Sequence, residues 1–273
     1  MPCFRYCIKF IVVVISFPLF LSDAKEEIAP KIRIIHGDWG EASKEEIHAV
    51  LSCTAESLLD QVELRPKAIL VGRSSNGPIV LFKRGEKGEF FINLNTQDRF
   101  WSQYVFQFAH EIGHIICGFK EGYRGNLWFE ETICEVASLY ALQSMSKKWK
   151  DSPPFSNWKS YAEEFNKYAS NRIERNSFLD NGKFLEWYRS NRHSLIMNPT
   201  DRSRNCKIAT ILLPLFKNNS LSWSSCQFLN QRKKLGEKSF NQYLLEWKQN
   251  CPLPGQKKFV MEVSSLFRIQ FTE

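Results

Sequence analysis

Two histidines four residues apart, on a stretch that has the pattern of an uninterrupted helix, constrain this chain more than any other feature. His110, Glu111 and His114 form a His-Glu-x-x-His pattern, and the residues from 101 up to it contain neither proline nor glycine. Apolar residues recur through 101–116 at an approximately helical period. Positions i and i+4 share one helix face, so both imidazoles are expected on the same side. The sequence therefore predicts a helix that carries a two-histidine site.

The chemistry of these three side chains is that of a zinc centre that acts on a substrate. Imidazole nitrogens bind zinc, and a hydrolytic zinc site keeps one open position beside its protein ligands. Glu111 directly follows the first histidine, so it is expected to reach that position as the general base toward a water whose pKa zinc lowers to roughly 7. The expected cofactor is Zn2+, the expected ligands include His110 and His114, and the expected reaction is hydrolysis of an amide.

A third ligand is expected downstream, because catalytic zinc takes three protein donors. The run Trp128, Phe129, Glu130 and Glu131 resembles the gluzincin metallopeptidases related to thermolysin and aminopeptidase N, whose third ligand is a glutamate on the helix after the histidine helix. The resemblance covers about residues 88–145. It implies that Glu131 is the third zinc ligand and that the chain is a zinc-dependent peptidase.

The same resemblance implies a partner for the first histidine. Thermolysin-like members carry a carboxylate four residues past the ligand, and Glu135 stands at that spacing from Glu131. A ligating histidine needs an acceptor for its second ring N–H, which fixes its tautomer, so Glu135 is expected to hold His110. Glu130 falls on another face of the helix and is expected to be solvated or to lie at the helix start.

The chain also departs from these enzymes. The segment between His114 and Glu131 is slightly shorter than theirs, so a tight connection is expected. The sequence contains no Gly-Ala-Met-Glu-Asn run, with which the aminopeptidases hold a free amino terminus, and this disfavours an exopeptidase. Spacing does not identify the group that meets the oxyanion of the transition state. The candidates are Tyr123, Tyr140, Tyr188 and His193.

The amino terminus has the pattern of a signal peptide. Arg5 and Lys9 precede an apolar run over 10–21, and small residues end at Ala24. The run is shorter than the roughly 20 residues that a helix needs to cross a bilayer, although an uncleaved tether is the alternative. Residues 1–24 are therefore expected to direct export, and the mature protein is expected to be secreted or periplasmic without a membrane span.

The cysteines suggest disulfides without deciding their pairing. Eight are present, of which Cys3 and Cys7 fall in the signal peptide. An even number in an oxidising compartment favours disulfides, and Cys117 with Cys134 is the suggestive pair because each lies three residues from a proposed ligand. The alternative is buried free thiols. The six that follow residue 24 are Cys53, Cys117, Cys134, Cys206, Cys226 and Cys251, of which Cys226 and Cys251 could form a second bridge.

The chain is expected to divide near residue 150, where a charged run meets paired prolines. Acidic residues outnumber basic ones over 25–146, and the reverse holds over 147–273. Scattered lysines and arginines are typical of a solvated surface, so nucleic-acid binding is not expected. The predicted organisation is a signal peptide over 1–24, a catalytic domain over 25–150 and a mainly helical region over 151–273.

The predicted fold is α+β, with a zincin-like catalytic domain built on a mixed sheet. A strand over 89–95 lies just before the histidine helix, and the resemblance implies that it is the edge strand over that helix, along which an extended peptide pairs. The expected partner is thus a peptide or protein substrate. The other expected elements are strands over 31–36, 67–72 and 79–84, the last forming a hairpin with 89–95, and a helix over 43–62.

Two functions of different kinds remain open. One is an exported zinc peptidase with Glu111 as base. The other is a binding or scaffold protein on a zincin-like fold, with its zinc structural or lost. A purely structural site has no need of a carboxylate at the water position, so the presence of Glu111 favours the enzyme. Endopeptidase or exopeptidase action and the oligomeric state stay open.

Overall fold

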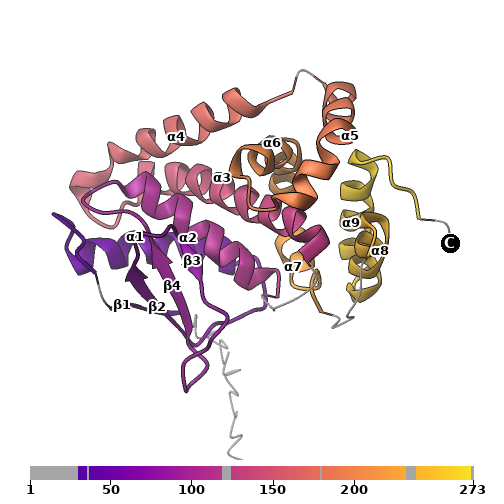
Figure 1. Cartoon of the computed structure of the whole chain (residues 1–273). Coiled ribbons are helices and arrows are strands. Elements are labelled where there is room, and N and C mark those ends of the chain that lie inside the picture. Colours follow the sequence, from indigo (N-terminus) through magenta and orange to yellow (C-terminus); the bar gives the residue numbers. More distant parts are fainter. Residues whose placement is uncertain (1–29, 36, 119–123, 179, 232–237, 272–273) are drawn as a thin grey trace, which may run out of the picture.

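A four-stranded mixed sheet forms the amino-terminal side of the protein, in the order β1-β2-β4-β3 (Figure 1). In this computed structural model β1 (Lys31–Ile34) and β4 (Phe90–Leu94) pair parallel with β2 (Ala68–Arg73), while β3 (Ile79–Val80) pairs antiparallel with β4. A parallel strand inside a sheet is covered on both faces, which is why β2 is an almost continuous apolar run. The structure describes residues 30–35, 37–118, 124–178, 180–231 and 238–271.

The expectation of an edge strand over 89–95 is wrong. β4 lies inside the sheet, with β2 on one side and β3 on the other, so the edge beside the histidine helix belongs to β3. The hairpin between the two strands is confirmed, since β3 and β4 are antiparallel neighbours, although β3 itself has only two residues. A hairpin pattern predicts that two strands pair, but it does not say which of them also joins the rest of the sheet.

Two helices pack beside the sheet. α1 (Lys44–Leu59) begins at a capping box, in which the Ser43 hydroxyl accepts from the Glu46 N–H and the Glu46 carboxylate accepts from the Ser43 N–H. α2 (Trp101–Ile116) has the bounds that the sequence predicts and is buried around nearly its whole circumference. A helix covered on all sides is apolar all round, so the buried histidines of α2 stand out against their surroundings.

The longest helix, α3 (Leu127–Asp151), follows the turn η1 (Arg124–Asn126) and runs across the middle of the protein beside α2 (Figure 1). It ends where the sequence predicts a division. No helix in the described part of the chain is long and apolar enough to cross a membrane. The later elements are η2 (Ser156–Trp158), α4 (Tyr161–Asn176), α5 (Asn181–Met197), α6 (Arg202–Asn218), α7 (Ser222–Cys226), α8 (Phe240–Asn250) and α9 (Pro254–Leu266).

An aromatic cluster joins the start of α3 to the carboxyl-terminal helices. The rings of Trp128 and Phe240 lie 4.7 Å apart, and those of Phe129 and Phe240 lie 5.1 Å apart. Phe267 and Tyr188 complete this cluster, with ring centroids 5.0 Å apart. Such packing buries large apolar surface, so the helical region is fixed directly onto the end of α3 that carries Glu131.

Candidate metal centre

Helix α2 brings His110 and His114 together on one buried face. Their side chains project from successive turns, and the ring centroids lie 5.2 Å apart. The two residues are only 3% and 8% exposed. Imidazoles buried in an apolar helix need partners for their ring nitrogens, and each ring has a hydrogen-bond partner for one nitrogen on α3.

A glycine lets the two helices approach closely at this point. A Cβ added at Gly113 would lie 2.9 Å from Cα of Cys134 and 3.0 Å from its Sγ, so no larger residue fits without movement of α3. The close approach brings Cys134 beside the histidines. His110, His114 and Cys134 can each offer a ligand atom, all within 4.8 Å of one another, and they form a possible buried metal site.

The carboxylate of Glu131 also lies against both rings. Its Oε2 is 3.1 Å from Nε2 of His110, and its Oε1 is 3.7 Å from Nε2 of His114. Burial alone would raise the pKa of Glu131, but the hydrogen bond with His110 and the charge of His114 outweigh it, and the pKa is lowered. The acid that the sequence proposes as third ligand therefore faces the Nε2 atoms of both histidines.

Glu111 lies on the same helix and contacts the sheet edge. Its Oε2 accepts a hydrogen bond of 2.7 Å from the backbone N–H of Val80 in β3. The residue is buried, as are its neighbours on α2. The carboxylate expected to act as base is thus held by the first strand of the hairpin, between the histidine helix and the edge of the sheet.

Glu135 lies beside His110, at a distance too long for a hydrogen bond. Its Oε1 is 3.7 Å from Nδ1 of His110, and its Oε2 is 3.9 Å from the guanidinium of Arg172. Both oxygens and the Nδ1 atom are buried, and none of the three has a hydrogen-bond partner in the part of the chain that the structure describes. Burial raises the pKa of Glu135, and the charges of His110 and Arg172 oppose this only in part.

Glu130 lies in the first turn of α3, as one of its two expected places has it, but the expectation that it is solvated is wrong. Its Oε1 lies 2.7 Å from Nδ1 of His114, and its Oε2 accepts a hydrogen bond of 2.8 Å from Nδ2 of Asn230. Burial would lower the pKa of His114, but Cys134 and Glu130 outweigh it, and the pKa is raised well above its usual value. Sequence reasoning missed Asn230 because 100 positions separate it from Glu130 and no motif marks it.

The candidates for the oxyanion-binding group lie in different surroundings. Tyr123 is outside the described residues. Tyr140 packs against Trp223, and Tyr188 belongs to the aromatic cluster, where burial raises its pKa to about 12. His193 is exposed on α5. The structure brings none of the three described candidates into a hydrogen bond with the histidines or with Glu131.

The six cysteines of the described residues are free thiols, so neither suggested bridge, Cys117 with Cys134 or Cys226 with Cys251, is present among them. The hydrogen-bond partner of the Cys117 side chain is instead Cys226 of α7. Burial raises the pKa of Cys117 and of Cys134, which keeps both thiols protonated at neutral pH. The spacing of the cysteines from the proposed ligands did not reveal that α7 packs at the end of α2.

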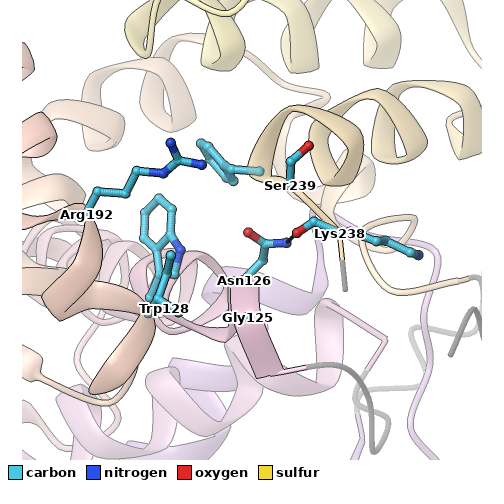
Figure 2. Close-up of a pocket in the computed structure, with 8 residues that line it drawn as sticks. Gly125, Asn126, Trp128, Arg192, Lys238 and Ser239 are labelled. Carbon is cyan, nitrogen blue, oxygen red and sulfur yellow. Dashed lines mark hydrogen bonds between the residues drawn. The ribbon is translucent and has the colours of Figure 1, made fainter. Parts of the chain in front are cut away.

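A cavity of about 320 Å³ opens near the amino-terminal end of α3 (Figure 2). In it, Nδ2 of Asn126 donates a hydrogen bond of 3.0 Å to the carbonyl of Lys238, while Arg192 extends from α5. No residue of the metal centre lines it. The lining residues are Gly125, Asn126, Trp128, Arg192, Ile196, Lys238, Ser239 and Phe240.

The centre thus combines two histidines of one helix with acids and a thiol of the next. Its residues come from α2 and α3, and partners from β3, α4 and the segment after α7 surround them. Comparisons of the chain with protein-family models, with curated proteins and with solved structures found no match.

Proposed function

We propose that the protein is a zinc-dependent peptidase in which His110, His114 and Glu131 hold the metal and Glu111 is the general base. The observation that carries the proposal is the place of the Glu131 carboxylate, 3.1 and 3.7 Å from the Nε2 atoms of the two histidines. Two imidazoles and one carboxylate are the ligand set of a hydrolytic zinc site. The resemblance of the sequence to the gluzincins supports the same assignment.

The donor atoms present fit zinc. Each histidine has one nitrogen toward Glu131 and the other toward a second acid, Glu135 or Glu130, as ligating histidines generally do. Cys134 is the competing third ligand, because its thiol is within 4.8 Å of both rings. We favour Glu131 because its oxygens lie 3.1 and 3.7 Å from the two rings and because its pKa is lowered, whereas the buried thiol would first have to lose a proton.

Glu111 and β3 would supply the rest of the reaction. Bound zinc would polarise the scissile carbonyl and activate water. Glu111 would take the proton of the attacking water and deliver it to the leaving amine. β3 is the edge strand beside Glu111, and its Ile79 is 49% exposed. An exposed edge pairs with extended peptides, which supports a peptide or protein substrate.

A second candidate function is a non-catalytic protein with a structural metal, and the closeness of Cys134 favours it. If the thiolate bound the ion together with both histidines and Glu131, four protein ligands would close the coordination shell and leave no place for water. The two candidates therefore differ in whether the metal needs Cys134 in addition to Glu131.

Metal analysis of three variants separates these candidates. The wild-type protein is expected to contain about one zinc. Glu131→Ala should lose most of the zinc, while Cys134→Ser, a substitution similar in size, should keep it. Glu111→Gln should keep the zinc yet lose cleavage of fluorescence-quenched peptides, because an amide does not accept the proton of water. Loss of zinc in Cys134→Ser would favour the structural site, and full occupancy in Glu131→Ala would contradict the peptidase site.

We also propose that the protein acts outside the cytoplasm, after removal of residues 1–24. The proposal depends on the charged and apolar pattern of that segment. Amino-terminal sequencing of the mature protein, expressed with its full leader, should begin at Lys25. A mature protein that begins at Met1 and stays in the cytoplasm would contradict it.

A further inference from the structure

We infer that Asn230 and Tyr243 are positioning residues for His114 and that they act on it through Glu130. The inference rests on the proposed metal role of His114, and it adds groups from the last third of the chain to the centre. Neither residue belongs to the sequence pattern around the histidines. Together with Glu130 they form a hydrogen-bonded chain, here called the His114 relay, that connects α8 to α2.

The contacts of the relay are short and continuous. Nδ1 of His114 lies 2.7 Å from Oε1 of Glu130, and Oε2 of the same carboxylate lies 2.8 Å from Nδ2 of Asn230. The hydroxyl of Tyr243 lies 2.9 Å from Oδ1 of Asn230. Glu130 and His114 are buried, and Asn230 and Tyr243 are half-buried, so the protein shields these hydrogen bonds from competition with water.

The chemistry of the acceptors fixes the direction of each hydrogen bond. Asn230 turns its NH2 group toward one oxygen of Glu130, and the Nδ1–H of His114 is the donor that faces the other oxygen, because carboxylate oxygens accept. The amide oxygen then faces Tyr243, which must donate its hydroxyl proton. Burial, followed by the charge of Glu130, raises the pKa of Tyr243, so the phenol keeps that proton.

This direction has a consequence for the metal site. A neutral imidazole with its proton on Nδ1 presents the lone pair of Nε2, and Nε2 is the atom of His114 that faces Glu131. The relay therefore selects the tautomer that can bind a metal beside Glu131. Asn230 keeps the Glu130 carboxylate turned toward the ring, and Tyr243 keeps the Asn230 amide from flipping.

Two substitutions break the relay without changing the shape of the side chains greatly. Asn230→Asp replaces the donor toward Glu130 with a second acid, which repels the carboxylate. Tyr243→Phe removes only the hydroxyl. Tyr161→Phe on α4 is the matched control, because the Tyr161 ring packs against Phe165 and the relay does not include it. All three variants are made in the full mature chain, and circular dichroism verifies that each one folds.

The first measurement is zinc affinity in competition with a chromophoric chelator. We expect Asn230→Asp to weaken zinc binding by about 10- to 100-fold, the scale for partners of ligating histidines. We expect Tyr243→Phe to weaken it by roughly threefold to tenfold, the scale of one hydrogen bond. The visible spectrum of the Co2+-substituted protein should change in both variants, and Tyr161→Phe should match the wild type in affinity and spectrum.

The second measurement is the Nδ1–H signal of His114 in proton–nitrogen spectra, read with and without zinc. The signal should exchange slowly in the wild type and faster in both relay variants. Folded relay variants with wild-type zinc affinity, cobalt spectrum and Nδ1–H exchange would overturn the inference and leave the peptidase proposal intact. If the wild type instead binds zinc without cleaving peptides, the peptidase proposal fails, and a loss of zinc affinity in the variants still supports the relay.

Discussion

The two acids that face the proposed zinc-binding histidines from behind differ in how well they are satisfied. Glu130 is hydrogen-bonded through both oxygens, whereas neither oxygen of Glu135 has a hydrogen-bond partner. A buried acid without donors destabilises a fold. Glu135 therefore resembles a group kept for function at a cost in stability, which is common in active sites.

Substitution of Glu135 should separate stability from metal binding. Glu135→Gln removes an ionisable group from a fully buried position, so the metal-free protein should gain roughly 1 kcal/mol of stability, while zinc affinity falls by about tenfold. Because the folded protein raises the pKa of Glu135, ionisation opposes folding increasingly as the pH rises through that pKa. The gain should therefore be larger at pH 8 than at pH 5.

Urea unfolding at the two pH values and chelator competition give both quantities. Arg172→Gln is a useful comparison, because it removes a charge that opposes the pKa shift of Glu135 and should destabilise the protein. A Glu135→Gln variant with unchanged zinc affinity would mean that its spacing from Glu131 is coincidental.

The sequence predicted the position of a side chain correctly where the helical repeat determines which way that side chain points. His110, His114 and Glu131 lie near one another as expected, because spacing along α2 and a family resemblance both bear on them. The burial of Glu130 was not predicted in this way. The spacing excluded it from the face of Glu131, but only the packing of the segment after α7 onto α3 explains why it is buried.

Among the helices, the contact of α2 with α3 determines whether the centre can form. Gly113→Ala adds a Cβ that would lie 2.9 Å from Cα of Cys134, so the two helices must separate. An exposed helical Gly→Ala change usually gains up to about 1 kcal/mol. Here overpacking should cost roughly 1–3 kcal/mol, and zinc affinity should fall because His114 moves away from Glu131.

Thermal unfolding and chelator competition measure both effects. Gly182→Ala on α5 is the control for zinc affinity, because its added Cβ would meet only the N-cap carboxylate of Asp180 and not the contact of α2 with α3. A stabilised Gly113→Ala protein with normal zinc affinity would show that α2 and α3 can separate without harm to the centre.

The elements whose pattern is local were predicted well. The bounds of α2 agree with the apolar period of the sequence, and α1 begins at its capping box. The place of β4 inside the sheet was not predicted, nor was the hydrogen bond between the thiols of Cys117 and Cys226. Both depend on contacts between distant segments, which the periodicity of one segment does not contain.

For the molecule as a whole, the aromatic cluster at the start of α3 ties the metal centre to the carboxyl-terminal helices. Phe240→Ala removes a ring that is packed against Trp128, Phe129 and Phe267. We expect a loss of roughly 3–5 kcal/mol in the free energy of unfolding. We also expect one cooperative transition, because the cluster belongs to the same continuous core as α2 and β2.

Calorimetry together with circular dichroism tests this expectation. Phe155→Ala, at a residue 40% exposed, is the control and should shift the transition little. Two separate transitions, with only the later one changed by Phe240→Ala, would mean that residues 25–150 and 151–273 unfold independently.

The hydrogen bond between Glu130 and Asn230 also determines when the centre becomes complete during synthesis. The two residues are 100 positions apart, and ribosomes add roughly 5–20 residues per second, so about 5 to 20 s pass between their appearances. During that interval the nascent chain contains both histidines and Glu131 but lacks the donors that orient His114. A nascent chain that has not yet reached Asn230 therefore lacks the full set of hydrogen bonds around His114.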